Sequence, residues 1–501
     1  MKKLSVRKRC TLIIGAVLLA IYLIVSVIFW FTGMPKIFFR YNVKEDNTIS
    51  IDYYSGFFPL LRIPDKIDGL PVTEMDMRLN EYSIYSREEY KYRKNYLASF
   101  TVAVHIPDSV EILRNGVFNG FSRLTFVNIP SSLRSTENDV FANTNVYKLV
   151  FPEGITEIGV SYEENFSKYW SFANMKQLRK VVFPESLKKI GKYAFENCPR
   201  LRKVTLPEGL EEIGNGAFRE CGLTKINIPK NLKKTGGTTF YDTPFEKKLK
   251  KKADGDFIIF NGDIIYKYIG KDENVIIPDN IISICDQAFW KSKIKSVTIP
   301  EGVKSVGGAF EYSGIEKIKL PDTVEGNDLE FCDCKYLKEI MLPENTTKLH
   351  SYAFKNCYSL ENIVLPEGIT EIGDEAFSNC SNLSEIKLPE GLIEIGDSAF
   401  SKCAFFSEIK LPEGLTKIGS NAFEYCQNLK DIEIHEGVTE IESGTFSFCT
   451  SLERIVIPES VTYIGNGAFW NCTSLKEVVI KGDPVIEENA FTDCGSLENK
   501  P

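Results

Sequence analysis

The side chains with the greatest chemical potential in this chain are its cysteines. Thirteen are present, and six of them follow one another at constant steps of 23 residues: Cys357, Cys380, Cys403, Cys426, Cys449 and Cys472. Only Cys332 and Cys334 lie close together, and no Cys-x-x-Cys pair with a nearby histidine completes a set of zinc ligands. The sequence therefore predicts no metal site.

The three histidines do not indicate catalysis either. His105, His350 and His435 each replace one residue of the repeat described below. None has a serine, a cysteine or an acid in a context typical of a catalytic triad. Glycine-rich phosphate loops are also missing from the sequence. We therefore expect no catalytic or cofactor-binding residue, no cofactor and no small-molecule substrate, so the protein is predicted not to be an enzyme.

A repeat of 23 residues positions the cysteines. Residues 383–405 read Leu-Ser-Glu-Ile-Lys-Leu-Pro-Glu-Gly-Leu-Ile-Glu-Ile-Gly-Asp-Ser-Ala-Phe-Ser-Lys-Cys-Ala-Phe, and neighbouring units are nearly identical. A strict period of this length is the signature of a solenoid. Solenoids form long surfaces more readily than enclosed active sites. The repeat therefore indicates a binding protein.

Each repeat unit contains a short strand, a residue that ends the strand, and a segment that leads the chain back toward the next strand. Residues 383–388 are predicted to form a short strand, and Pro389 ends it because proline lacks the ladder N–H. Gly396 permits a tight turn or a positive φ. Ala399 allows close stacking of coils, and Phe400 fills the interior. We expect stacked coils to pair these strands into one long parallel sheet on one face of the rod.

Stacked coils would also place the cysteines in an internal column, with neighbours about 4.8 Å apart. Small, weakly polar cysteine suits such a buried position, so we expect reduced thiols that serve packing. Disulfides are the alternative, because stacked neighbours fall within their Cα range of roughly 4.4–6.8 Å. Side chains that all point inward in parallel disfavour such bridges.

The proline position can be followed through seventeen slots, from Pro64 to Lys481. Breaks in the period fall within residues 76–100, 160–171 and 245–275, and the last contains a hairpin signal at Asn261-Gly262. The predicted organisation after the amino terminus is a capping repeat at 41–75, a Tyr- and charge-rich insertion at 76–100, leucine-rich repeats at 101–244, a hairpin-containing insertion at 245–275, leucine-rich repeats at 276–494 and a carboxyl-terminal tail at 495–501.

The amino terminus is predicted to be a membrane anchor. Residues 1–10 form a basic tail, and residues 11–32 contain no charge. As a helix, the uncharged stretch spans about 33 Å, which matches a bilayer core. The basic flank favours a cytoplasmic tail and a single-pass protein in the cell membrane with its solenoid extracytoplasmic. The alternative is a cleaved signal peptide, for which this stretch is long and has no small-x-small site.

The pattern Leu-Pro-Glu-Gly-Leu…Ile-Gly…Ala-Phe…Cys closely resembles the BspA-like, Treponema-type leucine-rich repeat family over about residues 44–494. The resemblance implies a bacterial or parasite surface protein that binds host or neighbouring-cell components such as matrix proteins. Departures are minor: Thr445 replaces alanine in one unit, and the coil at 322–334 lacks its Ile-Gly and Ala-Phe pairs.

The balance of charge narrows the class of partner. Residues 41–501 hold 53 basic and 68 acidic residues. Phosphate contacts need clustered positive charge, so we expect no nucleic-acid ligand. A protein ligand is expected instead, whether a host, matrix or envelope protein.

Two sets of residues are candidates for ligand binding. Outward strand positions form the first set, Glu385, Lys387, Glu408, Lys410 and Asp431, which would make a charge-patterned face. The alternative is a solvated lattice of weak surface salt bridges. The insertion at 76–100 supplies the second set, Tyr85, Arg87, Tyr90, Tyr92 and Arg93, because tyrosine and arginine are enriched in binding hot spots. Its alternative is a disordered or capping loop.

These observations predict a non-catalytic, membrane-anchored surface protein that mediates adhesion or protein–protein recognition. The alternative function is a structural scaffold that organises cell-envelope proteins without binding host material.

Overall fold

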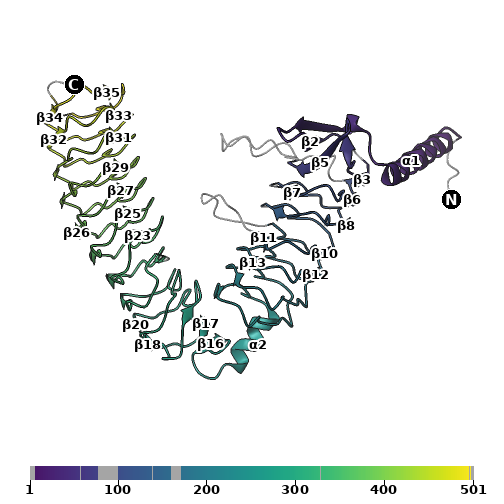
Figure 1. Ribbon diagram of the computed structural model, residues 1–501, viewed down its shortest axis with the longest axis horizontal. Helices are drawn as coiled ribbons and strands as arrows, with labels where there is room; N and C mark the ends of the chain where they lie inside the picture. Colours follow the sequence, from purple (N-terminus) through teal and green to yellow (C-terminus); the bar gives the residue numbers. More distant parts are fainter. Residues whose placement is uncertain are drawn as a thin grey trace. The chain divides into compact units, whose positions relative to one another are not determined.

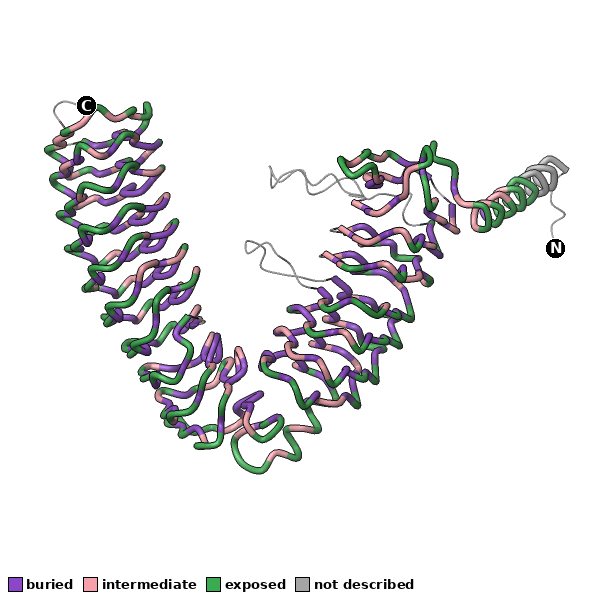
Figure 2. Tube along the Cα trace, in the orientation of Figure 1, coloured by how far each residue is buried: buried purple, intermediate pink, exposed green. Residues whose placement is uncertain are grey.

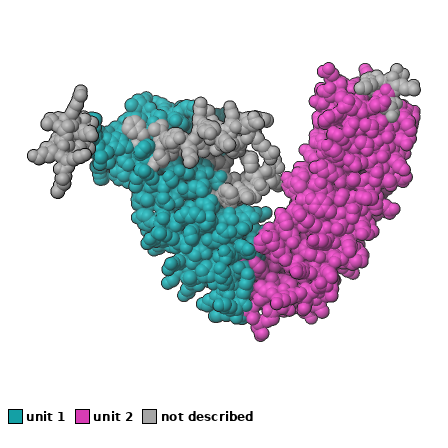
Figure 3. Space-filling view, turned by 180° about the vertical axis from the view of Figure 1, so that it is seen from behind, with its two compact units in different colours: residues 1–252 teal, residues 253–501 magenta. Residues whose placement is uncertain are grey.

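The computed structural model describes residues 6–56, 58–76, 100–114, 116–137, 139–159, 171–327, 329–495 and 497, with side chains in the amino-terminal helix described from residue 15. The chain forms two compact units, Met1–Lys252 and Ala253–Pro501 (Figure 3). Each unit is a stack of coils, and together the coils make a parallel β-solenoid of about seventeen turns, as the sequence predicts.

Unit 1 begins with helix α1 (Val6–Thr32), a short 3-10 turn (Lys36–Phe38) and the antiparallel pair β1 (Phe39–Val43) and β2 (Ile49–Tyr54). Two parallel ladders then run along the coils (Figure 1). The first ladder contains β3 (Leu60–Arg62), β6 (Ala103–His105), β8 (Phe126–Val127), β10 (Lys148–Val150) and β12 (Lys180–Val182). The second ladder contains β5 (Leu70–Met75), β7 (Ile112–Leu113), β9 (Ser135–Thr136), β11 (Glu157–Ile158), β13 (Lys189–Ile190), β14 (Glu212–Ile213) and β15 (Lys234–Thr235). Strand β4 (Lys66–Ile67) pairs antiparallel with β5, and helix α2 (Pro244–Lys252) follows the last coil.

Unit 2 opens with the hairpin predicted at Asn261-Gly262, formed by β16 (Phe257–Phe260) and β17 (Ile264–Tyr268). In unit 2 the first ladder is formed by β18 (Asn274–Ile276), β20 (Ser296–Thr298), β21 (Lys317–Lys319), β22 (Glu339–Met341), β24 (Asn362–Val364), β26 (Glu385–Lys387), β28 (Glu408–Ile409), β30 (Asp431–Ile432), β32 (Arg454–Ile457) and β34 (Glu477–Ile480). The second ladder comprises β17, β19 (Ser283–Ile284), β23 (Lys348–Leu349), β25 (Glu371–Ile372), β27 (Glu394–Ile395), β29 (Lys417–Ile418), β31 (Glu440–Ile441), β33 (Tyr463–Ile464) and β35 (Val485–Ile486).

The second ladder was not predicted from the sequence. Most of its strands in the regular coils are Xaa-Ile pairs such as Glu394–Ile395, in which the isoleucine is buried and its neighbour is partly or fully exposed. Two residues are too few to show the alternation by which strands are recognised. Strand β17 also pairs in parallel with β19, so this part of the predicted insertion at 245–275 belongs to the solenoid itself.

Phenylalanine rings and cysteines fill the interior of the coils. Figure 2 shows buried residues recurring along the coils of both units. Phe377 and Phe400 lie parallel with their ring centroids 5.3 Å apart, and the same stack continues through neighbouring coils. Cys403 is fully buried, and its Sγ donates to the carbonyl oxygen of Phe377 at 3.2 Å. The twelve cysteines whose side chains are described are free thiols.

Gly396, the glycine of the Ile-Gly pair in one regular coil, serves close packing of backbones and does not adopt a positive φ. A Cβ at Gly396 would lie 2.7 Å from the amide nitrogen of Asp374 and 2.8 Å from the carbonyl carbon of Gly373, in the preceding coil. The left-handed residue is instead the non-glycine Ser398, with φ +53°. A second left-handed position precedes the cysteine of each regular coil, for example Lys402 at φ +64°.

Candidate recognition surface

The outward face of the first ladder in unit 2 displays most of the predicted charge pattern. Strands β28 and β30 bury their second residue, β26 half-buries its central Ile386, and the three strands expose Glu385, Glu408 and Asp431. Glu408 lies in register with Asp431, and Glu385 with Asn362. These three carboxylates form an acidic row, named here the acidic row of unit 2. None forms an ion pair with another described residue.

The two lysines on this face behave differently from each other. Lys387 lies 3.2 Å from Glu367, in a pair that is largely exposed to solvent. Lys410 makes no ion pair within the described part of the chain. Farther along the same face, Lys317 pairs with Glu339 at 2.7 Å and Arg454 with Glu477 at 2.9 Å. The salt-bridge lattice therefore covers both ends of the face and is absent from the acidic row between them.

Repulsion between the carboxylates of the acidic row lowers the stability of the fold, and a bound ligand can relieve this repulsion. Like charges directly opposite one another on parallel strands are destabilising. A cationic partner would remove this repulsion, and exposed charges of one sign also steer an oppositely charged partner toward the surface. The row can thus attract a basic protein surface, but it supplies no nucleophile or proton-transfer pair.

The second predicted set, Tyr85, Arg87, Tyr90, Tyr92 and Arg93, lies outside the described residues, as does most of the insertion at 76–100. The structure therefore gives no geometry for this set.

The described histidines do not form a catalytic constellation. His105 is half-buried against Trp30, with ring centroids 6.1 Å apart. Burial and the nearby Arg62 guanidinium lower the pKa of His105. Among the described residues, Nδ1 of His105 and Nε2 of His435 have no hydrogen-bond partner. Within the described ranges, no group of three or more His, Cys, Asp or Glu side chains is arranged to hold a metal ion.

The buried thiols are protected from ionisation. Burial raises the pKa of the Cys380 thiol well above its ordinary value, and the same holds for Cys357, Cys403 and Cys426. Cys332 is the least buried of the described cysteines, and burial together with the adjacent Asp333 carboxylate raises its pKa to about 12. Because the thiolate is the reactive species, these cysteines are structural.

A family model described as the BspA type leucine rich repeat region matches residues 88–168, 167–250, 262–384 and 370–498. The chain belongs to this BspA-type leucine-rich repeat family. The match spans most of the solenoid and agrees with the two ladders and the internal phenylalanine and cysteine columns described above. In this family the leucine-rich repeat fold is associated with protein interaction.

The chain is similar to several solved structures at low identity. A leucine-rich repeat protein from Bacteroides ovatus ATCC 8483 is 21% identical, with a TM-score of 0.29, and the match covers 85% of this chain and 98% of that one. The leucine-rich repeat protein of T. pallidum is 18% identical, with a TM-score of 0.19 and coverage of 70% and 91%. Pneumococcal PcpA is also 18% identical, with a TM-score of 0.30 and coverage of 90% and 96%. No curated protein matches the chain.

Proposed function

We propose that this BspA-type solenoid is a membrane-anchored, extracytoplasmic protein that recognises a partner protein through unit 2 and performs no catalysis. The observation that carries the proposal is the acidic row of unit 2, whose stacked carboxylates Glu385, Glu408 and Asp431 face solvent without ion-pair partners among the described residues. The partner is a host, matrix or envelope protein with a basic surface.

The amino-terminal helix supports the anchor in this proposal. Residues Gly15–Thr32 of α1 are long and apolar enough to cross a membrane, and only 6% of this segment is buried against the rest of the chain. Leu18, Ile24 and Phe31 are more than half exposed to solvent. A lipid bilayer would cover these side chains, whereas a cleaved signal peptide would remove them.

Charge reversal of the acidic row tests recognition. The triple variant Glu385→Lys, Glu408→Lys and Asp431→Lys is compared with a control that changes net charge equally, Glu301→Lys, Glu325→Lys and Glu440→Lys, at exposed positions off the acidic row. Partners cross-linked on intact cells are identified by mass spectrometry, and their affinity is measured with purified full chain. We expect the first variant to lose binding and the control to keep it. Equal binding by both variants would refute recognition by this row.

Protease treatment of intact cells tests the anchor and the topology. Release of solenoid peptides with residues 1–32 retained in the membrane agrees with the proposal. Protection of the solenoid until lysis would contradict the extracytoplasmic placement and favour an internal scaffold.

A further inference from the structure

The outward face of the first ladder in unit 1 has a composition that is different from that in unit 2. Four lysines occupy the first outward position of successive coils: Lys148, Lys180, Lys203 and Lys225. Lys148 is in register with Lys180, and Lys203 with Lys225. Two arginines, Arg179 and Arg202, precede two of these lysines and are also exposed. We name these six side chains the cationic row of unit 1.

None of the six cations forms an ion pair with a described residue, although acids are available to other cations of the same coils. On the second ladder, Lys189 forms an ion pair with Glu212 at 3.0 Å, and Lys233 forms one with Glu211 at 2.6 Å. The coils therefore neutralise one face and leave stacked positive charge on the other. Like charges facing each other across strands are destabilising, so an anionic surface would relieve this face.

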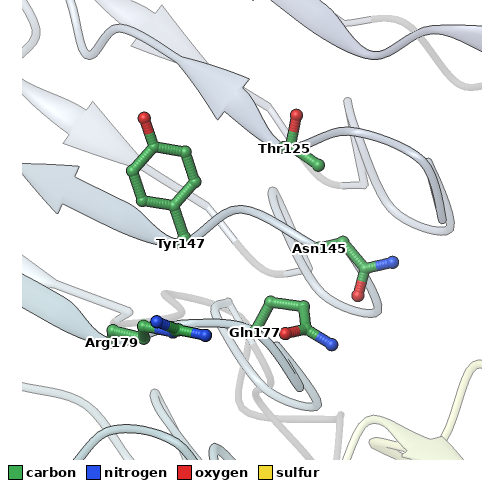
Figure 4. A pocket seen from close by; sticks show the side chains of 5 residues that line it. All are labelled: Thr125, Asn145, Tyr147, Gln177 and Arg179. Atoms are coloured by element: carbon green, nitrogen blue, oxygen red, sulfur yellow. The ribbon is translucent and has the colours of Figure 1, made fainter.

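Exposed apolar side chains are interleaved with the cationic row. Phe126 is 45% exposed, Tyr147 50% and Val150 43%, and Val182 is also exposed. Beside them lies a shallow pocket of about 450 Å³ lined by Thr125, Asn145, Tyr147, Gln177 and Arg179 (Figure 4). A headgroup phosphate could accept from the Arg179 guanidinium and the two amide groups, while the Tyr147 ring enters the interface. Aromatic and cationic side chains together are typical of a surface that contacts lipid headgroups.

The apolar helix joins unit 1 at this same face. The Trp30 ring packs edge-on against Phe126 of β8, with centroids 6.3 Å apart, and Arg62 of β3 donates from Nη1 to the carbonyl oxygen of Trp30 at 3.3 Å. In Figure 1, α1 leaves unit 1 on the side that carries β3, β6 and β8. Trp30 lies near the carboxyl end of the apolar stretch, where a spanning helix reaches the membrane interface. The face that carries the cationic row therefore begins at that interface.

We propose that the first-ladder face of unit 1 lies against a membrane surface rich in anionic lipid, with the cationic row contacting headgroup phosphates and Phe126 and Tyr147 entering the interface. This inference rests on the anchoring helix of the proposed function and is independent of the acidic row of unit 2. Each basic residue close to an anionic membrane strengthens binding by about fivefold, and salt screens the attraction.

Lysine acetylation of the full chain in lipid nanodiscs tests this contact. The chain is reconstituted in phosphatidylcholine or in phosphatidylcholine mixed with phosphatidylglycerol, and acetylation rates are read by mass spectrometry. We expect Lys148, Lys180, Lys203 and Lys225 to react at least about threefold more slowly in the anionic discs, with the difference lost in high salt. The matched controls Lys188, Lys189 and Lys233, on the second ladder of the same unit, should react equally in both discs.

Charge reversal adds a second arm. The variant Lys180→Glu with Lys203→Glu should abolish protection of Lys148 and Lys225, whereas Lys304→Glu with Lys319→Glu in unit 2 should preserve it. Equal acetylation in both discs, or protection by a soluble sulfated polysaccharide but not by anionic discs, would overturn the inference. A chain that fails to co-purify with discs would refute the anchor itself. A chain that co-purifies without lysine protection would overturn only the lipid contact.

Discussion

A single added methyl group distinguishes the two kinds of glycine in one coil. At Gly396, a Cβ would lie 2.5 Å from Oδ1 of Asp374 and within 2.8 Å of two backbone atoms of the preceding coil. At Gly391, five residues earlier, the nearest atom to a Cβ is the Glu367 carbonyl oxygen at 3.7 Å, which is ordinary contact. Neither glycine has a positive φ. The pair therefore isolates the effect of close approach between coils.

The two alanine variants should shift local stability in opposite directions. Gly396→Ala forces the backbones of two coils apart, which costs about 1–3 kcal/mol for an overpacked site. Gly391→Ala introduces no clash and reduces the freedom of the unfolded chain, which stabilises by about 0.4–1 kcal/mol. A repeat array need not unfold in one step, so a local measurement is required.

Hydrogen exchange of peptides from residues 383–405 in the full chain provides that measurement, because amides in a coil exchange through its local opening. The cost at Gly396 corresponds to exchange that is about five- to 150-fold faster than in the parent chain. Gly391→Ala should leave exchange unchanged or slow it. If both variants exchange hydrogen at the same rate, close approach between backbones does not limit the spacing of the coils, and the role assigned to Gly396 is wrong.

Two further predictions concern ionisation and backbone strain. Burial and the neighbouring Glu330 carboxylate raise the pKa of Glu311 to about 8 from an ordinary 4.5. The folded protein therefore favours the protonated carboxyl group, and the stability that this group contributes is present at low pH and is lost as the pH rises from about 4.5 to about 8. Unit 2 should therefore show faster local exchange around residue 311 at pH 8 than at pH 5 after correction for intrinsic exchange, and Glu311→Gln should flatten this difference. An unchanged pH dependence in the variant would contradict the assignment to Glu311. Lys402 holds a left-handed conformation that asparagine tolerates better, and Asn379 one coil earlier already donates from Nδ2 to Oδ1 of Asn356 at 3.0 Å. Lys402→Asn should extend this row of asparagine hydrogen bonds and stabilise the coil by about 0.5–1 kcal/mol, measured by hydrogen exchange of the same peptides. Faster exchange in the variant would show that the lysine side chain itself stabilises the coil.

The sequence predicted the features of the fold that recur in every coil. Burial requires the same residue type at the same place in each turn, so the phenylalanine and cysteine columns appear directly as a period. The role of Gly396 was less accessible, because a close approach between coils depends on atoms 23 residues apart. The left-handed backbone at Ser398 and Lys402 carries no signature, since stacking of neighbouring coils overrides the local preference of these residues.

Of the two candidate surfaces, only the acidic row of unit 2 follows from the repeat. Glu385, Glu408 and Asp431 share one repeat position, so their exposure follows from the period. The cationic row of unit 1 falls on less regular coils, so the repeat did not lead to a prediction of this row. Contact between Trp30 and Phe126 joins residues almost 100 positions apart, which no local pattern encodes.

Because the regular coils are nearly identical, recombination within the gene can change their number without changing the fold. Successive rings from Phe377 to Phe446 are stacked 5.3 Å, 5.5 Å and 5.5 Å apart, so each coil offers its neighbours nearly the same contacts. Unequal recombination that removed or duplicated one 23-residue unit there would leave both ladders in register and the interior columns unbroken. The reach of unit 2 can therefore vary between strains by whole coils while its fold and the residues at its two ends are inherited unchanged.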